Sequence, residues 1–258
     1  MFMQPNPLKL KLQDRRTVYG VLSNITDPTI AEIIGFNSYD FYMIDDEHST
    51  VSTSEVANIV RACEVAGIVP MARIRSNDSK LILKYIDAGI KGVMMPSVYT
   101  PEDVEKLVRA VKYPPLGNRG LGAVRAANYM INQHDQLRYV QWANQQTLVI
   151  PQIETVEAVQ NLNELVKIKG VDGFVVGPKD LAMSMGFYDS AAHPEVTAVI
   201  HQIFSTVLKA GLVVGSVANT PEQARILESM GATFIFNSVV GLLTQSSKWF
   251  LGNRHGNK

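Results

Sequence analysis

The chain has 258 residues, of which 46% are hydrophobic and 19% charged, and 24 Lys and Arg residues balance 24 Asp and Glu residues. This zero net charge argues against nucleic acid or an anionic membrane as the main partner, because both select a basic surface. No apolar run has the ~18 residues of a membrane span, and no signal-peptide core is found. With Cys63 as its single cysteine, the chain cannot form an internal disulfide. We therefore expect a cytoplasmic protein with a small-molecule partner.

Short apolar strands alternate with amphipathic helices along the whole chain. The strands are predicted near Val18, Phe41, Pro70, Val93, Val149, Phe174, Val214 and Ile235. Helix starts are predicted at Thr100 and Thr220, because each threonine is followed by proline and, three positions on, by an acceptor side chain. Strands that alternate with helices pair in parallel, since each crossover needs a helix to return the chain.

Eight strand–helix units in a chain of this length predict an α/β fold, the TIM (β/α)8 barrel, with residues 1–258 forming a single domain. A doubly wound open sheet is the alternative. A long loop rich in Gly and Arg at about 113–135 interrupts the pattern, and in a barrel we expect it over the top face, where the strands end. A C-terminal helix is predicted at about 240–252, packed either on its own barrel or on a neighbour.

Polar residues gather where the predicted strands end, which is the face that carries the active site in TIM barrels. Strand two ends in Asp45, Asp46, Glu47 and His48. Three carboxylates beside an imidazole repel one another unless they are solvated or bind something. His48 is then either an ordinary histidine at a strand end or a general base or proton relay.

Strand three carries Arg73, which is hard to bury without an anionic partner. One candidate partner is a carboxylate of this chain. The other is the carboxylate of a substrate, which suits the two parallel hydrogen bonds of a guanidinium.

Glu154 and Asp180 hold matching places at the ends of strands five and six. Two carboxylates that converge over a barrel mouth either share a proton or hold a divalent cation. Alternatively, each caps the helix beside it, which suits Asp180 better than Glu154 because Thr155 is the better N-cap. We favour the metal site.

Six segments together resemble the metal-dependent class II pyruvate aldolases, the HpcH/HpaI aldolase family. In chain order they are YDFYMIDDEHS, PMARIRSND, IDAGIKGVMMPSV, YPPLGNRG, VIPQIET and GVDGFVVGPKDLAMSMG. The resemblance runs from about Tyr19 to Ser238, and the QIET and GPKDLA segments together are its most specific part. It implies a TIM barrel that assembles as a homo-oligomer, commonly a hexamer built as a trimer of dimers.

The resemblance also implies a role for each matching residue that would hold metal or substrate. Glu154 and Asp180 would be the metal ligands, and Arg73 would bind the 2-oxo acid and stabilise its enolate oxygen. Gln152 would lie beside the metal. The substrate carboxylate would meet the backbone of Gly177, Pro178, Lys179 and Asp180.

Proton transfer is assigned by the same resemblance. His48 would move protons, with Asp45 supporting the loop after strand two. Asp87 matches a family acid that pairs with the catalytic histidine, and since it falls at the end of a helix it would act across a subunit interface. Glu47 matches a family position without an assigned role. Asp46 departs from the family pattern and suggests extra negative charge near the metal, and with it a different second substrate.

The implied reaction forms or cleaves 4-hydroxy-2-oxo acids through a metal-bound pyruvate enolate, with His48 or a metal-bound water as the base. Its partners are a 2-oxo acid and an aldehyde. The metal is Mg²⁺ or Mn²⁺, with Co²⁺ and Zn²⁺ as alternatives because an oxygen-ligand site admits several ions. Two alternatives on the same scaffold are a siderophore-pathway synthase that condenses oxaloacetate with acetyl-CoA to citrate, and an oxaloacetate decarboxylase. A third is a catalytically silent barrel, which so many unpaired charges argue against.

Overall fold

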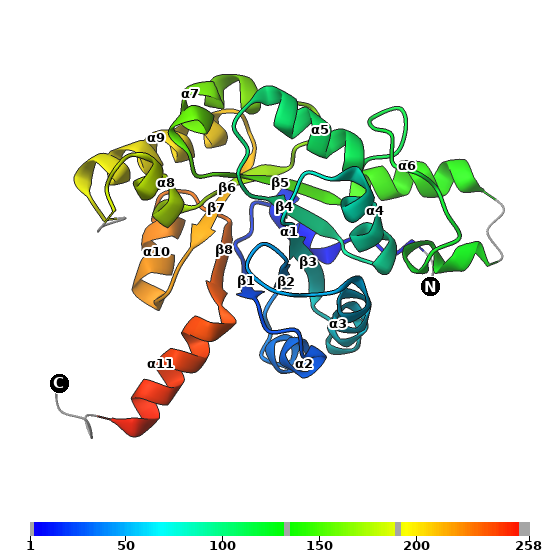
Figure 1. The fold of residues 1–258 in the computed structure, drawn as a ribbon, viewed down its shortest axis with the longest axis horizontal. Helices are drawn as coiled ribbons and strands as arrows, with labels where there is room; N and C mark the ends of the chain where they lie inside the picture. The colour runs from blue at the N-terminus through cyan, green and yellow to red at the C-terminus, as the bar shows by residue number, and fades with distance from the viewer. Residues whose placement is uncertain (1–2, 132–134, 189–191, 253–258) are drawn as a thin grey trace.

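Eight parallel strands form a closed barrel inside a layer of helices in the computed structural model, which describes residues 3–131, 135–188 and 192–252 (Figure 1). The strands are β1 Val18–Ser23, β2 Phe41–Asp45, β3 Val69–Arg73, β4 Gly92–Met95, β5 Leu148–Ile153, β6 Gly173–Val176, β7 Val213–Val217 and β8 Phe234–Ser238. They pair in chain order, and β1 closes the barrel against β8. The predicted TIM barrel is confirmed, and the open doubly wound sheet is excluded.

Helices return the chain between the strands and cover the outside of the barrel (Figure 1). Their bounds are α1 Pro7–Gln13, α2 Pro28–Phe36, α3 Thr53–Ala66, α4 Ser79–Ala88, α5 Pro101–Val111, the 3₁₀ helix η1 Arg125–Met130, α6 Gln136–Gln146, α7 Val156–Leu165, α8 Pro178–Ser184, α9 Pro194–Lys209, α10 Pro221–Ser229 and α11 Val239–Leu251. Thr100 and Thr220 are N-caps, as predicted, and each accepts a hydrogen bond from the backbone N–H three residues on.

Alternation along each strand builds two apolar layers. On β2, Phe41 and Met43 pack inside the barrel, whereas Tyr42 and Ile44 pack outward against the helices. Each fully buried side chain of this size contributes about 1.5–3 kcal/mol relative to an exposed one. The helix α1, which the sequence did not predict, adds its buried Leu8 and Leu12 to the inner layer.

The long loop lies at the opposite end of the barrel from the one expected. It follows the C-terminus of α5 rather than a strand, so it starts on the face where the strands begin. Arg119 Nη2 donates to Asp87 Oδ1 at 2.7 Å, at the C-terminal end of α4. Arg125 donates to the Ala88 carbonyl at 3.2 Å, at the same end of α4, and forms an ion pair with Glu64 near the C-terminal end of α3. The prediction of a loop over the top face is therefore wrong; its residues 132–134 lie outside the described residues.

The last helix, α11, leaves the barrel after its first turns and points away from it (Figure 1). Only Val239 of α11 is buried, and Trp249 and Phe250 near its end are 83% and 82% exposed. Among the described helices, α11 included, none combines the length and apolar character that crossing a membrane requires.

Gly215 tests how tightly the barrel wall is packed. A Cβ at this position of β7 would lie 2.0 Å from the Phe234 carbonyl oxygen on β8. We expect Gly215→Ala to lower the free energy of unfolding by about 3 kcal/mol, because the clash is with backbone that cannot move aside. Urea unfolding would measure the loss.

Gly120→Ala is the matched control, since nothing lies within 4 Å of a Cβ there. Its free energy of unfolding should stay within about 1 kcal/mol of the wild-type value. Equal losses in the two variants would contradict this account of the barrel wall.

Candidate active site

The inward positions of β2, β3 and β5 become polar at their carboxyl ends. Asp45 continues the inner series of Phe41 and Met43, and it stands in register with Arg73 of β3. Gln152 follows Leu148 and Ile150 on the inside of β5 in the same way. The strand alternation therefore brings residues from distant parts of the sequence to one barrel mouth.

Arg73 and Asp45 form a buried, two-pronged ion pair. Arg73 Nε donates to Asp45 Oδ1 at 2.9 Å, and Nη2 donates to Oδ2 at 2.7 Å. The third nitrogen, Nη1, lies 3.1 Å from Glu47 Oε2. Of the two partners weighed for Arg73, the chain's own carboxylates are thus present, and they hold the guanidinium plane in a fixed orientation.

Glu47 links this ion pair to His48. Its Oε2 lies 3.7 Å from His48 Nε2, and the imidazole itself is 65% exposed. Burial raises the pKa of Glu47, the positive charges of Arg73 and His48 oppose that shift, and the negative charges of Asp45 and Asp180 add to it. Asp45 Oδ1 also accepts the backbone N–H groups of Glu47 and His48, at 3.2 and 3.3 Å, so one carboxylate shapes the turn that carries both.

Glu154 is buried at the end of β5 and is held at both oxygens. Oε1 accepts the Ser97 N–H at 2.6 Å, and Oε2 accepts the side-chain amide of Gln152. Burial raises the pKa of Glu154 above its usual 4.5; the Ser97 N–H opposes that shift, and the negative charges of Asp180 and Glu47 add to it. The ionised carboxylate is therefore in an environment that disfavours it unless a cation is present.

Helix capping does not account for the two carboxylates. Thr155 caps α7, as predicted, by accepting the Ala158 N–H at 3.1 Å. The N-cap of α8 is Gly177, and Asp180 lies inside the first turn of that helix with its side chain exposed. Neither Glu154 nor Asp180 is therefore a helix N-cap.

A cavity of about 370 Å³ occupies the mouth. His48, Arg73, Gln152 and the turn Gly177–Asp180 line it, and Leu22, Val217 and Phe236 add an apolar wall. Glu154 adjoins the cavity through Gln152 and Gly177. A Cβ at Gly177 would lie 2.5 Å from Gln152 Nε2 and 2.7 Å from Glu154 Oε2, so only glycine lets the chain approach the carboxylate this closely.

The donor atoms at the mouth fit a hard divalent cation. Gln152 Oε1 is buried and has no hydrogen-bond partner among the described residues, and the neighbouring acceptors are the oxygens of Glu154 and Asp180. All are oxygen donors, the type that Mg²⁺ and Mn²⁺ prefer. The described part of the chain holds no cluster of three or more His, Cys, Asp or Glu that could bind a metal ion. A pair of carboxylates leaves positions open for other ligands, as catalytic sites require.

Asp46 and Asp87 lie elsewhere. Asp46 follows the outward series of Tyr42 and Ile44, and its fully buried carboxylate lies 3.5 Å from Arg75 Nε rather than in the cavity lining. Burial raises the pKa of this carboxyl. The prediction that Asp46 adds negative charge near the metal is therefore wrong, because its carboxylate points outward, away from the cavity. Asp87 pairs with Arg119 at the far end of the barrel within its own chain.

Ser97 is a contact of Glu154 that the sequence did not reveal. Its backbone N–H, which every residue except proline carries, makes the short contact at 2.6 Å, and its hydroxyl donates to the same Glu154 Oε1 at 3.5 Å. It stands just after β4, whose carboxyl end carries no charged side chain.

Comparison with known proteins identifies the family of this chain. The family described as HpcH/HpaI aldolase/citrate lyase matches residues 19–244. The 2-keto-3-deoxy-L-rhamnonate aldolase of Salmonella gallinarum (strain 287/91 / NCTC 13346) is 32% identical over 230 residues, 89% of this chain and 85% of the relative. The hydroxypyruvate/pyruvate aldolase of Cupriavidus necator is 32% identical over 235 residues, 91% of this chain and 86% of the relative.

Solved structures share the fold. A family protein from Burkholderia cenocepacia J2315 superposes with a TM-score of 0.89 at 31% identity, covering 95% of this chain and 98% of its own. Citrate synthase SbnG superposes with a TM-score of 0.86 at 29% identity, covering 95% and 96%. The chain belongs to the HpcH/HpaI aldolase/citrate lyase family and is a carbon–carbon lyase of the metal-dependent aldolase class.

Proposed function

We propose that this chain is a divalent-metal-dependent aldolase that forms and cleaves 4-hydroxy-2-oxo acids through the enolate of pyruvate or a related 2-oxo acid. One observation carries the proposal: Arg73, His48 and the carboxylates of Glu154 and Asp180 converge at one barrel mouth, in or beside a single cavity. The aldolases among its relatives support the same class of substrate.

Glu154 and Asp180 would hold the metal. When bound, a divalent cation supplies a Lewis acid that stabilises negative charge on a substrate oxygen. Mg²⁺ and Mn²⁺ match the all-oxygen donor set best, and Co²⁺ and Zn²⁺ are the alternatives. Gln152 would orient the Glu154 carboxylate through the hydrogen bond to Oε2.

Arg73 binds the oxo acid at its ketone oxygen in this proposal. A guanidinium has five N–H donors, and three contacts of Arg73 go to Asp45 and Glu47. The remaining donors can meet the ketone oxygen, where negative charge develops as the enolate forms. The substrate carboxylate fits the N–H groups of Lys179 and Asp180 next to Pro178, since early helical positions have no intrahelical partner.

His48 moves the proton. Its exposed imidazole lines the cavity and takes a proton from C3 of the 2-oxo acid to give the enolate. Glu47, 3.7 Å away, balances the imidazolium charge that results. The enolate carbon then attacks the aldehyde carbon, and the imidazolium returns its proton to the new hydroxyl oxygen. Cleavage of the 4-hydroxy-2-oxo acid is the reverse path.

A second candidate function rests on the similarity to citrate synthase SbnG. Here oxaloacetate would occupy the 2-oxo-acid position as the electrophile, and acetyl-CoA would supply the attacking carbon to give the citryl thioester. Water would then hydrolyse the thioester to release citrate and CoA. Decarboxylation of oxaloacetate is the third reaction that the same constellation could serve, because losing CO₂ also leaves an enolate for Arg73 to stabilise.

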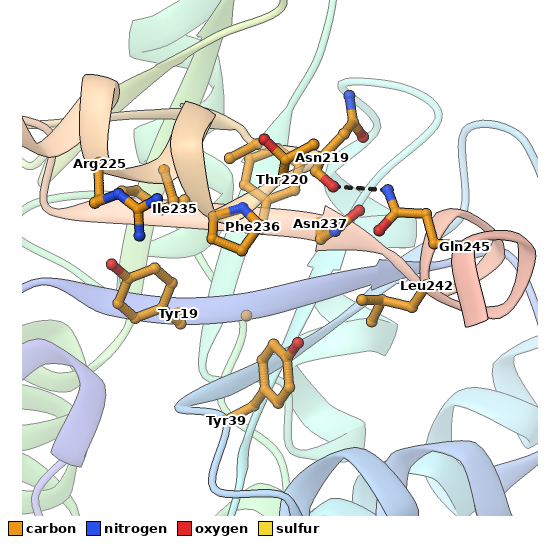
Figure 2. A pocket seen from close by; sticks show the side chains of 14 residues that line it. Tyr19, Tyr39, Asn219, Thr220, Arg225, Ile235, Phe236, Asn237, Leu242 and Gln245 are labelled. Atoms are coloured by element: carbon orange, nitrogen blue, oxygen red, sulfur yellow. Dashed lines mark hydrogen bonds between the residues drawn. The ribbon is translucent and has the colours of Figure 1, made fainter. Parts of the chain in front are cut away.

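We also propose that the chain forms a homo-oligomer, which its family resemblance suggests is a hexamer. A groove of about 450 Å³ lies between β1, β8 and α10, where a closed barrel would carry its last helix. Figure 2 shows Tyr19, Tyr39 and Leu242 around this groove, with Gln245 bonded to the Asn219 carbonyl at its rim. We propose that α11 of a second copy covers the groove with its exposed apolar residues, in a reciprocal exchange. In such an assembly Asp87 would meet the catalytic histidine of a neighbour.

Glu154→Gln tests the metal assignment without any substrate. Because burial raises the pKa of Glu154, its ionised form destabilises the metal-free protein, and stability is lost as pH rises above about 4.5, the usual value. With EDTA at pH 7 the variant should therefore melt at a higher temperature than wild type, and at pH 4 the difference should shrink. Adding Mn²⁺ should raise only the wild-type melting temperature.

Glu157→Gln is the control, since this glutamate is exposed on the first turn of α7 and faces no other acid of the site. It should keep both the wild-type melting temperature and the response to Mn²⁺. A Glu154→Gln variant that Mn²⁺ stabilises as strongly as wild type would remove Glu154 from the metal site.

Proton NMR of pyruvate in D₂O tests the reaction. We expect the methyl signal to disappear with Mg²⁺ and enzyme and to persist with EDTA, because only the active site can remove the C3 protons at neutral pH. His48→Asn should slow the exchange by about a hundredfold or more, and Arg73→Lys should do likewise, since an ammonium cannot form the two-pronged pair with Asp45.

Persistence of the methyl signal with every divalent metal tried would sink the aldolase proposal. Citrate formed from oxaloacetate and acetyl-CoA would then establish the synthase, and CO₂ release from oxaloacetate alone would establish the decarboxylase.

Substitutions in α11 and in the groove each test the proposed exchange. Trp249→Glu with Phe250→Glu alters the helix, and Ala224→Arg fills the groove. Each change should convert the wild-type oligomer to monomers in light scattering, with an unchanged circular dichroism spectrum, because Trp249 and Phe250 are exposed within one chain and Ala224 is only half-buried. A monomeric wild type, or variants that keep its mass, would refute the exchange.

A further inference from the structure

The loop from Pro96 to Thr100, between β4 and α5, has a strained residue next to the candidate metal site. Ser97 has φ of +51°, in the left-handed region that residues other than glycine rarely adopt. The residue is exposed, so packing of its side chain does not hold it there, and its hydroxyl makes only a long contact of 3.5 Å to Glu154 Oε1. Its N–H, however, points inward and donates to Glu154 Oε1 at 2.6 Å. Strain of this kind persists only where the surroundings impose it.

Side chains of two helices, α5 and α7, hold this loop from outside, and a third segment in turn holds α5. The Asp103 carboxylate of α5 accepts the N–H groups of Tyr99 and Thr100, each at 3.0 Å. Asn161 of α7 donates to the Tyr99 carbonyl at 2.8 Å. Asn77, just before α4, donates to the Asp103 carbonyl, also at 2.8 Å. The loop is thus fixed from sides that do not touch the cavity.

Capping of α5 does not by itself explain the conformation of Ser97. The cap requires only that Thr100 be extended, and Thr100 has φ of −124° and ψ of 162°. What the left-handed residue adds is the direction of one N–H, toward Glu154 Oε1.

We infer that Ser97 is a positioning residue for the metal site: its left-handed backbone aims one N–H at Glu154 Oε1 and so turns Oε2 toward Gly177 and the cavity. The inference rests on the proposed metal role of Glu154. The clamp on the loop supplies the rigidity, and the Gln152 amide at Oε2 completes the orientation. A carboxylate fixed in this way loses less rotational freedom when it binds a cation, which increases its affinity.

Ser97→Val and Ser97→Gly form a matched pair that isolates the backbone. Both remove the hydroxyl and keep the N–H, but glycine adopts positive φ freely, whereas a β-branched residue strongly disfavours it. Because the side chain is exposed, neither change disturbs the core. We expect Ser97→Val to weaken Mn²⁺ binding about tenfold and Ser97→Gly to stay within about twofold of wild type. Electron paramagnetic resonance of free Mn²⁺ would measure binding without any substrate.

Asn161→Ala is a second variant, remote from the cavity, that loosens the clamp. Its affinity for Mn²⁺ should fall between those of Ser97→Gly and Ser97→Val. Melting temperatures in EDTA would show that each variant remains folded before the metal is added.

The outcomes separate this inference from the proposed function. If wild type binds Mn²⁺, Glu154→Gln does not, and Ser97→Val binds as tightly as wild type, the inference fails while the metal site stands. Equal weakening in the valine and glycine variants would assign the effect to the hydroxyl and also overturn it. If wild type itself binds no Mn²⁺, or Glu154→Gln binds it as well as wild type, the metal assignment falls and the inference with it.

Discussion

Closure of the barrel fixes the direction of every strand side chain, and the rest of the molecule depends on that constraint. Inside a ring of eight strands only alternate residues have room, so Phe41 and Met43 commit Asp45 to the mouth. The same alternation on β3 and β5 brings Arg73 and Gln152 to the same place. The polar site thus takes its geometry from the apolar layers beneath it.

Charge divides the mouth into two unequal halves. On one side, Arg73 lies against Asp45 and Glu47, so the positive charge is compensated and its plane is fixed. On the other side, no salt bridge to Glu154 or Asp180 is present among the described residues, and burial makes the charge of Glu154 costly. An electronegative half beside a fixed guanidinium is complementary to a cation together with an anionic oxo acid.

Two apolar surfaces of the described chain are left uncovered. The groove over β1 and β8 lacks the helix that covers each other strand pair, while the apolar end of α11 packs against nothing in its own described chain. Burying apolar area from both would stabilise two copies at once, and the symmetry of the exchange closes the assembly without leaving a free edge. Under the proposed exchange, assembly would complete the packing that barrel closure leaves unfinished within one chain.

Local signals in the sequence determined the eight strands, the threonine caps and the residues at the strand ends, because alternation and capping act within a few positions of the chain. Of the residues that the strand ends singled out, Asp45, Arg73, Gln152 and the turn Gly177–Asp180 lie together at the mouth, and their roles there stay predictions. Only the tertiary structure decided the outward course of Asp46, the partners of Arg73 and Asp87, the side of the barrel on which residues 113–131 lie, and the departure of α11. The Ser97 N–H belongs to the same group. These features depend on contacts between segments far apart in the chain and on backbone groups that all residues share, so no local pattern of side chains records them.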